Sequence, residues 1–275
     1  MQKSTLTRAL VYGGRASLMV LDTTALVTEA VRRHNLSNAS ASALGCVLTA
    51  TAYLSAWLKD GTSTLSLTLK GDGECGVIHA SGDGALRISG RVENPAAESF
   101  EKAIGQNGVL SVTRDEGEGV PVTGTVAFYC GDAEEIFKAY FRESEQRETE
   151  IALSVSFGKD GLRAGGIFIQ PLPNAGKEIF ERAKADVAAC RVCLQAEDVS
   201  AGTLAYFQTE GERTEFGFRC RCSRERAERA IVSLGRAEAE KMLTETDAIT
   251  VHCDECNTDY IFDKACTNAL FGDKT

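Results

Sequence analysis

Two pairs of closely spaced cysteines near the C-terminus constrain this chain more than any other feature of its sequence. The pairs are Cys220-Arg-Cys222 and Cys253-Asp-Glu-Cys256, with residues 223–252 between them. Two close pairs of thiols joined by a folded insert form a tetrahedral site of four sulfurs, which suits Zn²⁺. The sequence therefore predicts a small zinc-binding module over residues 219–275.

The surroundings of the first pair leave two interpretations of this module open, a zinc site that reacts with oxidants and a purely structural one. Five arginines flank Cys220 and Cys222, namely Arg219, Arg221, Arg224, Arg226 and Arg229. Positive charge lowers the pKa of a thiol, and the thiolate is the form that reacts with oxidants. A purely structural zinc knuckle beside a solvated basic helix has the same pattern. The C-x-C spacing of the first pair, however, is shorter than the C-x₂-C of most such knuckles.

The total of 10 cysteines bears on the cellular compartment. Residues 1–7 are polar and do not resemble a secretory signal, so we expect a cytoplasmic protein, in which clustered thiols more often bind metal or perform redox chemistry than form disulfide frameworks. The longest apolar-rich run, Ala39–Leu58, is interrupted by Ser, Thr and Gly and predicts a buried helix, so no membrane partner is expected. The net charge of −9 argues against a nucleic-acid partner.

Residues 1–174 have the apolar patterns of an α+β fold and predict an N-terminal α/β-sheet core domain. Strands are predicted over Arg8–Tyr12, Ala16–Leu21, Thr64–Lys70, Gly76–Ala80, Ala85–Val92, Thr123–Tyr129, Ile151–Phe157 and Leu162–Gln170. Helices are predicted from Asp22 or Thr23 to about His34, over Ala39–Leu58, and from the capping residue Asp132. We expect the domain to end at Pro171 and Pro173.

The segment 175–218 is predicted to be a partly helical linker. Apolar residues recur at helical spacing as far as Cys190, but polar residues between them are dense, and no periodic pattern continues beyond Leu194. This segment holds a further C-x-x-C, Cys190-Arg-Val-Cys193. Outside a thioredoxin-like pattern we interpret it as two ordinary small residues, and we interpret the single Cys266 as an idle thiol.

Several motifs occur along the chain in a recognisable order. They are Lys70-Gly-Asp-Gly73, Gly90-Arg-Val-Glu-Asn-Pro95, Tyr140-Phe-Arg-Glu-Ser-Glu-Gln146, Gly165-Gly-Ile-Phe-Ile-Gln170, Phe218-Arg-Cys-Arg-Cys-Ser-Arg-Glu-Arg226, Ala230-Ile-Val-Ser-Leu-Gly235, and Cys253-x-x-Cys256 with Tyr260 and Phe262. Together they closely resemble the heat-shock protein 33 family, the 33 kDa chaperonins, from about residue 8 to about residue 265.

The resemblance implies a non-enzymatic chaperone, a holdase that binds unfolding client proteins under oxidative stress without ATP. In the reduced state it implies an inactive monomer with one Zn²⁺ per chain, held by Cys220, Cys222, Cys253 and Cys256. Oxidation would form the redox-active disulfides Cys220–Cys222 and Cys253–Cys256 and eject the zinc. It would then loosen the linker, expose a client-binding surface and favour a homodimer.

Two other classes of function remain as alternatives. A thiol–disulfide oxidoreductase would use Cys190/Cys193 or Cys253/Cys256, but such sites normally lie at a helix N-terminus, and an apparent strand precedes Cys253. A zinc-module nucleic-acid adaptor would use the arginines. The acidic chain and the lack of interleaved aromatic residues disfavour that alternative.

Overall fold

A computed structural model describes residues 3–272 of the chain, apart from residues 118 and 160. The chain forms two compact units that divide after Arg219, and each is described by itself. We refer to them as the first unit and the second unit. Among the described residues, no helix combines the length and the apolar character needed to cross a membrane.

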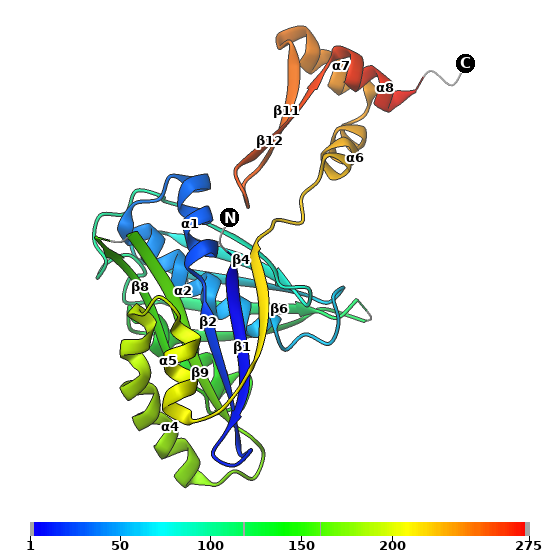
Figure 1. Cartoon of the computed structure of the whole chain (residues 1–275). Helices are drawn as coiled ribbons and strands as arrows, with labels where there is room; N and C mark the ends of the chain where they lie inside the picture. The colour runs from blue at the N-terminus through cyan, green and yellow to red at the C-terminus, as the bar shows by residue number, and fades with distance from the viewer. Residues whose placement is uncertain (1–2, 118, 160, 273–275) are drawn as a thin grey trace. The chain divides into compact units, whose positions relative to one another are not determined.

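The first unit is built on a ten-stranded sheet with the strand order β7-β6-β3-β4-β5-β10-β1-β2-β9-β8 (Figure 1). The strands are β1 (Ser4–Val11), β2 (Ala16–Asp22), β3 (Thr64–Gly71), β4 (Val77–Asp83), β5 (Arg87–Val92), β6 (Gly108–Asp115), β7 (Val122–Phe128), β8 (Glu150–Gly158), β9 (Gly161–Pro171) and β10 (Glu212–Phe218). Neighbouring strands are antiparallel except for β5 and β10, which run parallel. The α+β class and the predicted strands are confirmed, whereas β6 and β10 were not predicted.

Three helices pack against one face of this sheet: α1 (Thr24–His34), α2 (Asn38–Ser55) and α3 (Ala133–Glu143). Helix α2 is buried along nearly its whole length, as its small and apolar residues predict. Near its end the Tyr53 ring stacks on Phe168 of β9, with the ring centroids 4.1 Å apart. Asp132 caps α3 as predicted, because its side chain accepts a hydrogen bond from the Glu134 amide.

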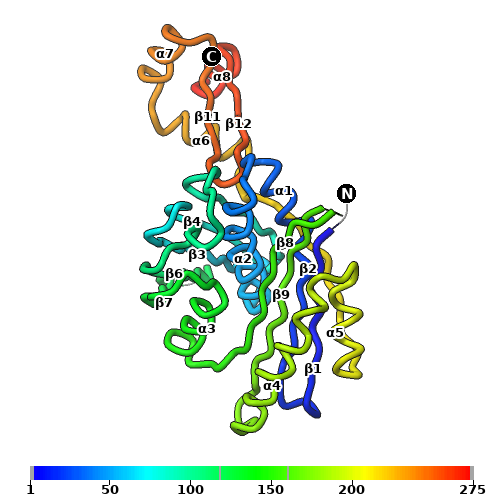
Figure 2. Tube along the Cα trace, turned by 90° about the vertical axis from the view of Figure 1, so that its left-hand side faces the viewer, coloured from blue at the N-terminus to red at the C-terminus, as the bar shows by residue number. Residues whose placement is uncertain are grey.

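Residues 175–218 belong to the first unit, and the helical part before β10 covers the opposite face of the sheet. They form α4 (Lys177–Cys190), a 3₁₀ helix η1 (Arg191–Gln195), α5 (Val199–Phe207) and β10. Figure 1 shows α4 and α5 alongside β9 and β2, and Figure 2 shows α2 and α5 on opposite sides of β9. The role of residues 175–218 as a redox-sensitive linker stays a prediction.

Alternation along the strands explains why both faces of the sheet are covered. In β2, Met19 and Leu21 join the core beneath α2, while Leu18 and Val20 point to the other face. On that second face a separate apolar cluster forms, which we call the second-face core. Its buried members are Ala9, Val11, Ala16, Leu18, Val20, Ala152, Ile167, Ile169, Ala175, Ile179, Ala183, Val187, Cys190, Leu194 and Val199.

This arrangement predicts a difference in thermal stability between two fragments of the chain. A fragment of residues 1–219 contains the whole sheet and both of its covering layers, so we expect it to unfold in one cooperative transition. A fragment that ends at Ala175 lacks α4, α5 and β10 and leaves the second-face core open to water. We expect its melting temperature to be lower by about 10 °C or more, a shift of several kcal/mol. Thermal circular dichroism of both fragments is the test, and equal melting temperatures would contradict it.

The second unit is a β-hairpin with three helices. The hairpin consists of β11 (Ala248–Cys253) and β12 (Thr258–Asp263), and the helices are α6 (Arg224–Leu234), α7 (Arg236–Glu245) and α8 (Lys264–Phe271). Its core comprises the buried residues Ala227, Ile231, Ala239, Ile249 and Phe262, with partly buried neighbours. An apolar core of this size supplies little stability, so the unit needs a further source of folding free energy.

Candidate metal centre

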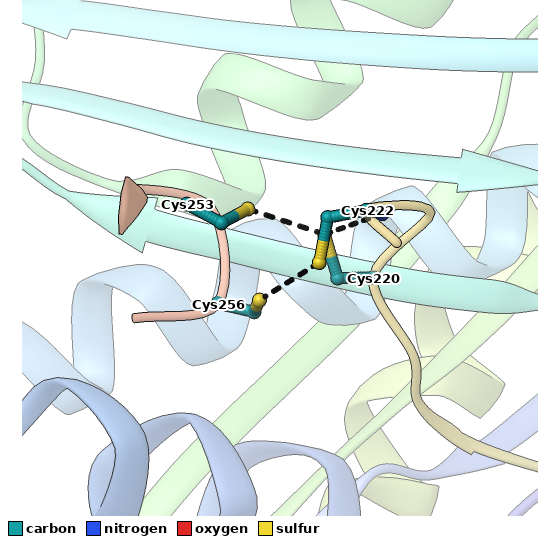
Figure 3. A group of neighbouring side chains, drawn as sticks. All are labelled: Cys220, Cys222, Cys253 and Cys256. Carbon is teal, nitrogen blue, oxygen red and sulfur yellow. Dashed lines mark hydrogen bonds between the residues drawn. The ribbon is translucent and has the colours of Figure 1, made fainter. Parts of the chain in front are cut away.

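The four cysteines of the two predicted pairs come together in the second unit. Cys220 and Cys222 lie just before α6, Cys253 ends β11, and Cys256 lies in the turn that leads to β12. Figure 3 shows their side chains pointing toward one another, and all four Sγ atoms lie within 4.8 Å of one another. The Sγ atoms of Cys220 and Cys253 are 3.7 Å apart, and those of Cys222 and Cys256 are 3.4 Å apart.

Local backbone structure explains how each pair is held. In the hairpin turn, the amides of Cys256 and Asn257 both donate to the Cys253 carbonyl, at 3.3 and 2.8 Å, which folds Cys256 back beside Cys253. Asn257 allows this turn because it adopts a left-handed backbone conformation. At the other pair, the Cys222 amide donates to Cys220 Sγ at 3.4 Å, and the Ser223 side chain caps α6 immediately afterwards.

The donor set and its spacing fit a zinc ion. A tetrahedral ion with Zn–S bonds of about 2.3 Å holds its sulfurs about 3.8 Å apart, close to the separations observed here. Four thiol ligands form a soft site, and a tetrahedral S₄ arrangement is typical of zinc or iron–sulfur centres. The four cysteines are therefore able to hold a single metal ion.

The electrostatics of the thiols also favour a bound cation. Burial, together with hydrogen bonds to Cys256 and Cys222, raises the pKa of Cys253 to about 11, and burial likewise raises the pKa of Cys220. Burial opposes ionisation of Cys222 as well, but hydrogen bonds from Tyr260 and Cys256 outweigh it and lower the Cys222 pKa. Cys222 is thus the thiol of the cluster whose ionisation the surroundings favour, and four thiolates together require a cation.

Two side chains of the hairpin contact the sulfurs directly. The Tyr260 hydroxyl, from β12, donates to Cys222 Sγ at 3.1 Å, and the Cys256 thiol donates to Thr258 Oγ1 at 3.2 Å. In the sequence, Tyr260 was identified only as one of the motif residues that resemble the family. Its contact with Cys222 could not be predicted, because it depends on the hairpin register. Hydrogen bonds of this kind orient metal ligands and tune their charge.

A substitution at Tyr260 tests this role. We expect Tyr260→Phe to weaken zinc binding about 10-fold or more, the usual effect of losing an outer hydrogen bond to a ligand. Competition against a chromogenic chelator measures the affinity. Tyr129→Phe, at an exposed tyrosine of the first unit, is the matched control and should leave the affinity unchanged. An unaltered affinity in Tyr260→Phe would show that this hydrogen bond does not support the site.

The predicted effect of the five arginines on the thiols stays a prediction, and two of the arginines make contacts with other parts of the second unit. Arg224 lies over the Phe262 ring, 4.3 Å from its centroid, and donates to the Ile261 carbonyl. Arg226 donates to the Arg221 carbonyl at 3.2 Å. The main causes of the thiol pKa shifts are burial and the hydrogen bonds among the thiols and Tyr260. These two arginines therefore stabilise the fold around the site.

The other cysteines in the C-terminal third do not belong to this cluster. Cys190 and Cys193 belong to the first unit, at the end of α4 and in η1, and Cys266 is exposed on α8. Nearby, His252 pairs with Asp259, their Nδ1 and Oδ1 atoms being 2.6 Å apart. Over the described part of the chain, the four sulfurs form the group of ligand-type side chains that is close enough to hold a metal.

Comparison with known proteins gives one consistent answer. The family described as "Hsp33 protein" matches residues 4–263. The 33 kDa chaperonin of Bacillus licheniformis is 31% identical over 96% of this chain and 98% of its own length, and that of Bacillus cytotoxicus is 34% identical over 95% and 96%. The crystal structure of a 33 kDa chaperonin, a heat shock protein 33 homologue from Thermotoga maritima, matches with a TM-score of 0.85 at 26% identity, over 98% of each chain. With its fold, its cysteine cluster and its relatives in agreement, this chain belongs to the Hsp33 family.

Proposed function

We propose that this protein is a redox-regulated, ATP-independent molecular chaperone that binds unfolding proteins and prevents their aggregation under oxidative stress. In the reduced, inactive state, Cys220, Cys222, Cys253 and Cys256 hold one Zn²⁺, which supplies the positive charge that four adjacent thiolates need. Oxidation to the disulfides Cys220–Cys222 and Cys253–Cys256 releases the zinc and activates the chaperone. The family membership and the names of the relatives support the chaperone role.

The observation that carries the redox part is the convergence of four sulfurs within 4.8 Å in a unit with a small apolar core. Metal binding of this kind supplies folding free energy, so the second unit is expected to depend on it. Two thiols that pass two electrons to hydrogen peroxide form one disulfide and two water molecules. Sulfurs paired in this way no longer ligate zinc as thiolates, so oxidation removes the metal and the stability that it supplies.

The client-binding surface that we propose is the second-face core of the first unit. Residues 177–207, which we call the covering segment, bury this apolar sheet face. Strand β10 follows the covering segment and runs directly into Cys220, and the Arg219 amide at its end donates to the Ile88 carbonyl at 2.7 Å. Melting of the second unit would free this end of β10. Release of the covering segment would then expose an apolar patch suited to unfolded chains.

The position of the C-x-x-C motifs disfavours the oxidoreductase alternative. Cys253 ends a strand and Cys190 ends a helix, whereas the attacking thiol of such enzymes normally lies at a helix N-terminus, where its pKa is lowered. Burial instead raises the pKa of Cys190 to about 12.

An aggregation assay with zinc release measured in parallel tests the proposal. The reduced protein should fail to suppress aggregation of a thermally unfolding client, and the peroxide-treated protein should suppress it without ATP while releasing one zinc per chain. We also propose a cytoplasmic protein that is monomeric when reduced and dimeric when oxidised, which light scattering can follow. Equal suppression by both forms, or activation with zinc retained, would refute the redox mechanism.

A further inference from the structure

A second pair of thiols lies where α4 passes into η1. Cys190 is the last residue of α4 and is 1% exposed within the second-face core, and Cys193 is half-buried in η1. Cys190 is also the N-cap residue of η1. A step of three residues advances about 4.5 Å along the axis of an α-helix and about 6 Å along that of a 3₁₀ helix. A disulfide spans Cα atoms about 4.4–6.8 Å apart. The backbone of this corner therefore suits a Cys190–Cys193 bond.

Packing buries the Cys190 sulfur and partly covers the Cys193 sulfur while the covering segment lies on the sheet. The Cys190 side chain faces the second-face core, and its burial, with smaller contributions from Cys193 and Asp186, raises its pKa. The Cys193 sulfur packs against α5 at Gly202, where an added Cβ would lie only 3.2 Å from it. A buried, protonated thiol reacts slowly with oxidants, since the thiolate is the nucleophile.

A polar clamp on Asp186 holds this corner in place. The Asp186 carboxylate, on α4, accepts hydrogen bonds from the hydroxyls of Tyr12 and Tyr206, both at 2.8 Å. Tyr12 lies at the tip of the β1–β2 hairpin and Tyr206 on α5, so one carboxylate joins three elements of the first unit. A second contact lies beside the thiols, where Arg191 donates two hydrogen bonds to Glu134, at 2.7 and 2.6 Å.

We propose that Cys190 and Cys193 form a conditional disulfide site, which oxidises only after the covering segment has left the sheet. Once released, the Cys193 thiolate attacks hydrogen peroxide, which gives a sulfenic acid and hydroxide. The Cys190 thiolate then displaces hydroxide from that sulfenic acid, and the disulfide forms. This step would follow zinc release and give the oxidised chain a third disulfide. The order rests on the proposed function, whereas the shielding of the pair rests on the first unit alone.

The test uses a substitution that loosens the covering segment and leaves the four zinc ligands unchanged. Full-length, zinc-loaded protein is treated with hydrogen peroxide, free thiols are trapped, and the Cys190–Cys193 disulfide is followed by mass spectrometry. We expect Asp186→Ala to speed its formation about 10-fold or more in the interval before zinc is released, because hydrogen bonds to a charged group are lost. Glu181→Ala is the matched control, since Glu181 lies on the same helix with its carboxylate exposed at the surface. Tyr206→Phe removes a single hydroxyl and should give a smaller increase.

Hydrogen exchange of α4 in the same samples decides the outcome. Across the wild type and the three variants, the rate of disulfide formation should follow the extent to which α4 opens. A rate that is independent of opening overturns the proposal, whether the pair reacts at once in the packed protein or never reacts. If oxidised wild type loses zinc while the pair stays reduced, and Asp186→Ala still oxidises it, then the coupling in the proposed function fails and this site stands.

Discussion

Cys253→Ser is expected to abolish tight zinc binding and to unfold the second unit while the first unit stays folded. Structural zinc in small modules contributes about 10–16 kcal/mol of apparent binding free energy, and that free energy is used in folding. Among the described residues, the apolar core of the second unit is small, so it is not expected to replace this contribution. Its buried side chains are Ala227, Ile231, Ala239, Ile249 and Phe262. A serine in place of one thiolate removes a ligand from a four-sulfur site and leaves the hairpin turn without its metal.

Two measurements check this expectation. Metal analysis should fall from one zinc per chain to near zero, and hydrogen exchange should lose protection in β11 and β12 but not in β1 or β2. Cys266→Ser is the matched control, because Cys266 is an exposed cysteine of the same unit and should change neither result. Full zinc retention in Cys253→Ser would remove this residue from the ligand set. Zinc loss with an intact hairpin would show that the unit folds without metal.

Leu194→Asp is expected to make the reduced, zinc-bound protein active as a chaperone. Leu194 belongs to η1, is 1% exposed, and packs into the second-face core. A carboxylate there would lie among the apolar side chains of this core, and burying a charge costs several kcal/mol, so the covering segment should leave the sheet. If this apolar face binds clients, release without oxidation should bring aggregation suppression close to that of the oxidised wild type.

The matched control lies two residues away. Val192 belongs to the same 3₁₀ helix but is 74% exposed, so Val192→Asp places the same charge in water and should leave the reduced protein inactive. Zinc content should remain at one per chain in both variants, which separates release of the segment from loss of the metal. A Leu194→Asp protein that is open by hydrogen exchange yet inactive would exclude the second-face core as the client surface.

The elements that could be predicted from the sequence are those determined by local sequence features. The β1–β2 hairpin was predictable, because two apolar runs enclose Gly13 and Gly14, and both glycines adopt the positive φ that this turn requires. The capped start of α3 was predictable for a similar reason. Strand β10 was not, since Phe216 is its one buried residue and its place depends on pairing with distant strands.

The same distinction applies to the candidate site. Cysteine spacing predicted the group of four sulfurs, because the two pairs are each close in sequence. The contact of Tyr260 with Cys222 depends on the hairpin register, and the clamp of Asp186 on Tyr12 joins residues 174 positions apart. Pro171 and Pro173 do end β9, but nothing local indicates that the chain returns to the same sheet afterwards.

The position of β10 has a consequence for the synthesis of the protein on the ribosome. This strand lies between β5 and β1, where Ser4 pairs with Phe216, so the two halves of the sheet are joined by one of the last strands of the first unit to be synthesised. At about 5–20 residues per second, β1 waits for this partner for roughly 10–40 seconds. Throughout that interval, one edge of β1 and one edge of β5 have no strand to pair with, and open edges recruit other chains. The nascent chain is therefore itself prone to aggregation until β10 has left the ribosome.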